Sequence, residues 1–241
     1  MTRTPRWAWG WTAVRAASAV LIAAEVIAQA SRTIGGMVAV GGDVLTTVVN
    51  FFSFFTILSN VLSVVVLAWA AIWFWMRRQE PAAPEPRSLA VALACATSYM
   101  IVTGLVYNVL LRGIPLPQGT TVAWSNEVLH VVGPIVLGAD LFLGPRRRAL
   151  PWRAVAEVLV LPIVWVVYTL IRGPLTTNPN TGEPFWYPYP FLNPNASPGG
   201  YGTVALYVVG IAVVIALAAW LVVWVGRRRG THAAAEARGA L

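Results

Sequence analysis

Two short motifs place polar side chains inside segments that otherwise read as membrane-spanning helices. They are FFSFFTILSN, over residues 51–60, and WSNEVLHVVGP, over residues 124–134. An unsatisfied polar group in hydrocarbon costs several kcal/mol, and an ionisable group inside a membrane segment is by default functional. The hydroxyl of Thr56 and the imidazole of His130 are the groups that nucleophilic acyl transfer requires, because the imidazole takes a proton as the hydroxyl attacks a carbonyl.

Helical spacing gives both residues polar neighbours. Asn60 follows Thr56 by four residues, so the two share a helix face. Asn126 precedes His130 by the same interval. Amide or backbone N–H groups can hold an oxyanion, and a carboxylate can orient an imidazole. The residues that we expect in these supporting roles are Asn60, Asn108, Asn126 and Glu127. The predicted chemistry requires neither a cofactor nor a metal.

Two other interpretations of these residues stay open. In a structural interpretation, the Thr56 hydroxyl bonds to a carbonyl of its own helix and the asparagines join neighbouring helices. In a second functional interpretation, the protein is a transporter or a small-ligand receptor, and the same polar residues line a binding cavity. The two functional interpretations differ at Thr56, because a hydrolase needs its hydroxyl whereas a cavity should tolerate valine there.

The elements that must position these residues are membrane helices. Hydrophobic residues make up 58% of the 241 residues, charged residues 11%, and the mean hydropathy is +0.68, which excludes an ordinary soluble domain. A span needs about 20 apolar residues. Six windows qualify, near 9–31, 45–76, 88–111, 123–144, 152–171 and 203–225. We therefore predict an all-α bundle of six transmembrane helices as one domain, residues 1–226. The first residues of the long second window could form a separate connection.

Charge supports the same topology. All seventeen basic residues are arginines, and alternating the connections between two sides puts thirteen on one side and three on the other. The positive-inside rule then places both termini in the cytoplasm of a multi-pass plasma (inner) membrane protein. The net charge of +8 thus describes orientation, and we expect the lipid bilayer, not nucleic acid, as partner. Among the acidic residues, we expect Asp140 and Glu157 to pair with the cluster Arg146–Arg148.

Three further segments carry expectations. With both termini inside, the second and fourth spans run the same way, which puts Thr56 and His130 at one depth near the outer boundary. The outer loop 172–202 is rich in prolines and aromatic residues, so we expect an ordered cap over that site or an anchor at the interface. Residues 227–241 read as a basic, disordered cytoplasmic tail. The first span resembles a secretory signal, but Glu25 interrupts its apolar run and favours an uncleaved helix.

The motifs FFTILSN and NEVLHVVGP resemble those of a bacterial family of six-span proteins called Pr-six-Pr. The same signature continues with YPYPFLNP over residues 187–194 and GGYG over residues 199–202. This family is similar, more distantly, to the eukaryotic androgen-induced membrane hydrolases, which cleave fatty acid esters of hydroxy fatty acids with an intramembrane threonine and histidine. The resemblance implies a lipid-ester hydrolase, with a membrane lipid as substrate, Thr56 as nucleophile and His130 as its histidine.

Overall fold

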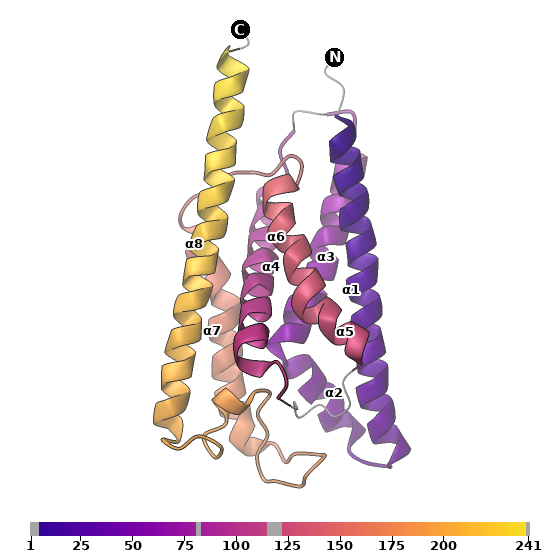
Figure 1. Ribbon diagram of the computed structural model, residues 1–241, viewed down its shortest axis with the longest axis vertical. Coiled ribbons are helices and arrows are strands. Elements are labelled where there is room, and N and C mark those ends of the chain that lie inside the picture. The colour runs from indigo at the N-terminus through magenta and orange to yellow at the C-terminus, as the bar shows by residue number, and fades with distance from the viewer. Residues whose placement is uncertain (1–4, 81–82, 115–121, 240–241) are drawn as a thin grey trace.

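The computed structural model describes residues 5–80, 83–114 and 122–239 (Figure 1). Within these residues all regular structure is helical, and six helical segments are long and apolar enough to cross a membrane. They are α1 (Arg6–Ala39), α3 (Phe55–Met76), α4 (Arg87–Val106) continued by the π-helix η1 (Tyr107–Leu111), α5 (Ala123–Glu127) continued by the π-helix η2 (Val128–Val132) and α6 (Gly133–Leu143), α7 (Ala154–Arg172), and α8 (Tyr201–Gly239). The predicted all-α class and the six spans are confirmed.

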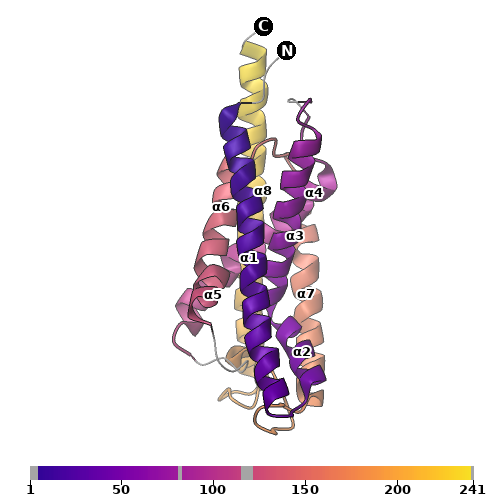
Figure 2. The ribbon, with the colours of Figure 1, turned by 90° about the vertical axis from the view of Figure 1, so that its right-hand side faces the viewer.

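The start of α1 and the end of α8 lie at the same end of the bundle, which we call the terminal end (Figure 1). The turn between α1 and a short helix, α2 (Val44–Ser53), and the long connection, residues 173–200, lie at the opposite end, which we call the distal end. The long connection contains two short 3-10 turns, η3 (Gly173–Leu175) and η4 (Pro190–Leu192). Helix α8 continues to Gly239, past the expected start of the tail at residue 227. In the view turned by 90°, α1 crosses the face of the bundle with α5 and α6 to one side and α3, α4 and α7 to the other (Figure 2).

The long second window is divided in two. A short helix, α2 (Val44–Ser53), precedes α3, and Phe54 between them is extended, with φ −71° and ψ 126°. The ring of Phe54 packs edge-on against Trp186 and Tyr189 of the long connection. The carbonyl of Ser53 accepts a hydrogen bond of 2.9 Å from the indole N–H of Trp165. Contacts with distant segments therefore fix the break, which falls where the local sequence has neither glycine nor proline.

Pro162 helps to join α7 to α4 because it leaves a backbone carbonyl of α7 without its usual partner. Pro162 lies inside α7 and has no N–H for the carbonyl of Val158, one turn earlier. The hydroxyl of Tyr99, on α4, donates to that carbonyl over 2.6 Å. Tyr99 is 1% exposed, so the freed carbonyl gives a buried phenol its partner and joins α4 to α7.

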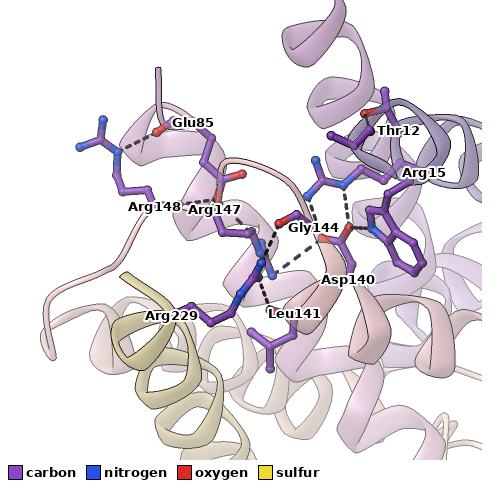
Figure 3. Close-up of polar contacts among 11 residues, drawn as sticks. Thr12, Arg15, Glu85, Asp140, Leu141, Gly144, Arg147, Arg148 and Arg229 are labelled. Atoms are coloured by element: carbon purple, nitrogen blue, oxygen red, sulfur yellow. Dashed lines mark hydrogen bonds and ion pairs between the residues drawn. The ribbon is translucent and has the colours of Figure 1, made fainter. Parts of the chain in front are cut away.

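A buried ionic cluster joins the terminal ends of several elements (Figure 3). Asp140 of α6 accepts hydrogen bonds of 2.6 and 3.0 Å from the guanidinium of Arg15 of α1, and a third of 2.6 Å from the indole of Trp11. Arg147, after α6, lies 3.8 Å from Asp140 and 3.9 Å from Glu85, which precedes α4. The expected pairing of Asp140 with the Arg146–Arg148 cluster is thus confirmed at Arg147, but Arg15 is its closest basic partner. The expected pairing of Glu157 with that cluster is wrong, because Glu157 pairs with Arg87.

Candidate functional site

Thr56 is the second residue of α3 and faces the long connection. The hydroxyl of Tyr189 accepts a hydrogen bond of 3.1 Å from the backbone N–H of Thr56 and lies 3.1 Å from Thr56 Oγ1. Tyr189 is 5% exposed and stacks on Phe191 at 5.1 Å. Burial raises the pKa of Tyr189 above its usual 10, although its hydrogen bonds with Thr56 act in the other direction. The phenol therefore holds its proton at neutral pH beside the threonine hydroxyl.

The position of Thr56 at a helix start has chemical consequences. The first four N–H groups of a helix have no intrahelical partner, and the N-terminus carries a partial positive charge. A negative charge that develops near Thr56 Oγ1 is therefore stabilised by the first turn of α3. The break at Phe54 produces this environment, which a continuous helix over residues 45–76 would lack.

A pocket of about 220 Å³ lies beside Thr56. Its wall combines side chains of α4, α7 and α8 with three residues of the long connection, including Tyr189. Thr56, Thr103, Tyr107 and Tyr189 belong to a lining that is otherwise aliphatic or aromatic. The side chain of Thr56 therefore meets an apolar space within the membrane-spanning part of the bundle.

His130 lies in η2 and is 4% exposed. Its Nδ1 is 2.9 Å from the carbonyl oxygen of Asn126, which can only accept, so Nδ1 carries the proton of the neutral ring and Nε2 keeps its lone pair. The imidazole stacks on the ring of Tyr107, with 3.7 Å between centroids and 18° between planes. The side-chain amide of Asn126 donates to the hydroxyl of Tyr107. Asn126 thus orients both stacked rings, and it holds His130 in the tautomer that a general base needs.

The carbonyl of His130 is also free for a neighbour. Pro134, four residues later, has no N–H to donate to it, and Asn108 Nδ2 donates over 3.3 Å instead. Asn108 Nδ2 also donates to Gly104 over 2.7 Å. A Cβ at Gly104 would lie 3.0 Å from the Pro134 ring and 3.2 Å from the His130 oxygen, so glycine allows this close approach. π-Helical turns such as η1 and η2 are frequent at functional sites.

Asn60 joins the two motifs. Its Nδ2 donates to the carbonyl of Thr56 over 2.9 Å and to the carbonyl of Leu129 over 3.4 Å. The first turn of α3 therefore lies beside the residue that precedes His130, as expected for two helices that run in the same direction. Asn60 is 0% exposed, and its Oδ1 has no hydrogen-bond partner among the described residues. This amide holds the two helices together through backbone groups.

Glu127 lies apart from these contacts. It is exposed, and its carboxylate accepts hydrogen bonds of 3.3 Å from Arg112. Arg112 also donates to Asn108 Oδ1 over 2.9 Å, and its guanidinium lies 5.5 Å from the centre of the Tyr107 ring. Arg112 therefore links Glu127 to the outer side of the stacked rings. The carbonyl that accepts a hydrogen bond from His130, and so orients it, belongs to Asn126 and not to Glu127.

Among the described residues no hydrogen bond joins Thr56 to His130. Tyr107 lies between the two, because it stacks on the imidazole and lines the pocket together with Thr56. Sequence reasoning did not assign Tyr107 or Tyr189 to the site. Tyr107 precedes Asn108 directly, and Tyr189 belongs to the YPYPFLNP signature, so both lay next to residues already singled out.

Within the part of the chain that the structure describes, no three His, Cys, Asp or Glu side chains gather closely enough to hold a metal ion. Compared with protein-family models, curated proteins and solved structures, the chain matches none. What the sequence and the fold establish together is a polytopic membrane protein built as a six-span apolar bundle.

Proposed function

We propose that this protein is an intramembrane hydrolase of lipid esters, with Thr56 as nucleophile and His130 as base. The observation that carries the proposal is the position of Thr56. Its hydroxyl lies at a helix N-terminus, contacts a buried phenol and borders an apolar pocket inside the membrane-spanning bundle. The arginine distribution supports a plasma-membrane orientation with the terminal end in the cytoplasm and this site near the outer boundary.

In the proposed reaction, Thr56 Oγ1 attacks the ester carbonyl carbon and its proton passes to His130 Nε2. The C–O bond of the alcohol then breaks, and the alkoxide leaves with that proton. Water then gives a proton to His130 Nε2 and attacks the acyl carbon. Thr56 Oγ1 leaves and takes that proton, which gives a fatty acid and free Thr56. The Nδ1–H tautomer of His130 and the stack on Tyr107, which borders the same pocket, support this role for the imidazole.

The supporting groups have separate roles in the proposal. The Tyr189 hydroxyl, which accepts from the Thr56 N–H, and the partial positive charge at the start of α3 stabilise the oxyanion. Asn126 orients His130 and Tyr107, whereas Asn60 and Asn108 hold the helices through backbone carbonyls. The resemblance of both motifs to Pr-six-Pr proteins, and more distantly to the androgen-induced hydrolases, supports the same chemistry.

The wall of the pocket favours a lipid over a polar solute. A transporter or receptor for a polar ligand needs amides and charges on the cavity wall. Here Asn60, Asn108 and Asn126 are engaged in contacts between helices, and none of them borders the pocket. An aliphatic and aromatic wall suits an ester that carries a hydrocarbon chain.

The test is hydrolysis of a panel of lipid esters by purified protein in detergent. Thr56→Ala and His130→Ala should each lower kcat by about 10³-fold or more, as losses of a nucleophile or its base do. Ser63→Ala is the matched control, because that hydroxyl bonds to a carbonyl of its own helix, two turns from Thr56. Mass spectrometry should find an acyl group on Thr56 after rapid quenching. Equal turnover by Thr56→Ala and wild-type protein, at equal melting temperatures, contradicts the proposal.

A further inference from the structure

The pocket beside Thr56 is elongated along the helices. On α4 and η1 its lining extends from Leu111 to Val102, and on α8 from Val208 to Ile215. At 1.5 Å per residue these intervals correspond to a length of about 10–14 Å parallel to the helix axes. Thr56 is at the start of α3 and Tyr189 belongs to the long connection at the distal end, so the pocket leads from these residues towards the middle of the bundle.

The exposed residues of the pocket lining indicate an opening between α7 and α8. Ile163 of α7 and Ala212 of α8 both line the pocket and are both exposed on the outer surface of the bundle, Ile163 to 57%. The two helices belong to the membrane-spanning set, so the medium outside this mouth is the hydrocarbon of the bilayer. A ligand that passes between Ile163 and Ala212 therefore comes sideways from the membrane.

The inner end of the pocket is closed. Val102 and Ile215 are 2% and 5% exposed and form a small apolar cluster with Ala218. Leu159 of α7 packs against the same cluster and also lines the pocket. Interiors of this kind are close-packed, so a chain that reaches these side chains has no space beyond them.

We propose that this pocket binds one acyl chain, which enters from the bilayer between α7 and α8, and that Val102, Leu159 and Ile215 limit its length. The carbonyl end of the chain lies at Thr56, so the inference rests on the proposed function for its chemistry but not for its binding. A cavity of about 150 Å³ holds one benzene molecule. A pocket of about 220 Å³ therefore has room for a single acyl chain but not for a complete two-chain lipid. An extended chain advances about 1.3 Å per carbon, from C–C bonds of about 1.5 Å, so the length corresponds to roughly 8–10 carbons.

The first experiment measures binding without turnover. Dissociation constants of saturated fatty acids from 4 to 18 carbons are obtained for the Thr56→Ala protein in nanodiscs by competition with a fluorescent fatty acid. We expect the tightest binding near 8–10 carbons and a loss of about tenfold or more by 16 carbons, because a closed apolar pocket rejects surplus methylenes at that level.

Substitutions at the two ends of the pocket test the assignment. Ile215→Ala removes three carbons from the closed end and should move the preferred length upward by about two or three carbons. Ala212→Phe fills the mouth and should weaken binding of every chain by about tenfold or more. Val213→Ala is the matched control, because Val213 is 52% exposed beside Ala212 but does not line the pocket.

The outcomes separate the two proposals. Affinity that is independent of chain length, or an Ile215→Ala protein with the wild-type preference, overturns the acyl-chain assignment. Chain-length-selective binding that shifts with Ile215→Ala supports it, even if wild-type protein hydrolyses no ester, and in that case only the hydrolase proposal fails. Hydrolysis of esters with equal kcat/KM from 4 to 18 carbons supports the hydrolase and overturns the length limit.

Discussion

Replacing Asp140 by asparagine should cost more stability than any exposed charge substitution in this chain. Asp140 is 0% exposed and Arg15 is 2% exposed, and the two are joined by two hydrogen bonds. Asparagine keeps the size of the side chain but removes its charge. The guanidinium of Arg15 then stays buried in a membrane helix, with the cations of Arg147 and Arg229 and the more distant carboxylate of Glu85 near it.

The expected magnitude follows from that isolation. Removing one partner of a buried ion pair costs about 3–5 kcal/mol, because the remaining charge loses its compensation. Replacing both partners, as in Arg15→Met with Asp140→Leu, removes the uncompensated charge and should recover most of that loss. The control is Glu80→Gln in the exposed pair with Arg77, whose side chains are 53% and 54% exposed, and it should cost at most about 1 kcal/mol.

The assay is reversible unfolding in mixed micelles of a mild detergent and dodecyl sulfate, followed by tryptophan fluorescence. The double substitution is measured beside each single one, so that the coupling between the two residues is obtained directly. An Asp140→Asn protein within about 1 kcal/mol of wild type would refute the reasoning that this carboxylate compensates a buried guanidinium. A double variant less stable than Asp140→Asn alone would refute it as well.

Other substitutions test separate parts of the structure. Tyr189→Phe removes the hydroxyl next to the proposed nucleophile but keeps the ring, so kcat for lipid esters should fall about 10–10³-fold with an unchanged melting temperature, and an unchanged kcat would contradict the oxyanion role. Gly173→Ala places a Cβ 2.1 Å from the ring of Tyr187 and should cost about 1–3 kcal/mol by thermal melt, whereas Gly202→Ala, with open space around it, should be neutral; equal melts for the two would argue against this contact. Burial raises the pKa of Glu85 above its usual 4.5, so the native state holds this proton more tightly than the unfolded chain does, and the free energy of unfolding should fall as the pH rises from 4.5 through that native pKa. Glu85→Gln should flatten that part of the pH profile of the melting temperature, and an unchanged slope would show that another group is responsible.

The spans could be predicted because their signal is one-dimensional. A membrane helix needs only a long enough apolar run, and the alternation of arginines between connections checks the number of runs independently. The division at Phe54 could not be predicted, since residues 45–76 form one apolar window. What interrupts the helix there is packing against Trp186 and Tyr189, more than 130 positions along the chain.

The candidate site was predictable to a similar degree. A histidine and a hydroxyl in apolar surroundings stand out by residue type, whereas Tyr107 and Tyr189 do not, because tyrosines are common where a bundle meets the interface. The pairing of Asp140 with Arg15 spans 125 positions, and only the packing of α1 against α6 reveals it. Sequence position suggested oxyanion or orienting roles for Asn60 and Asn108; in the structure each side-chain amide donates to one carbonyl of its own helical segment and to one of a neighbouring segment.

The two prolines that free a carbonyl have a consequence for how this sequence can change. Pro134 makes the oxygen of His130 available to Asn108, and Pro162 makes the oxygen of Val158 available to Tyr99. Each proline therefore supplies a free carbonyl to a side chain on α4 or η1, although the proline itself makes no hydrogen bond with that side chain. In an alignment of related chains, substitutions of Pro134 should accompany substitutions of Asn108, and substitutions of Pro162 should accompany those of Tyr99.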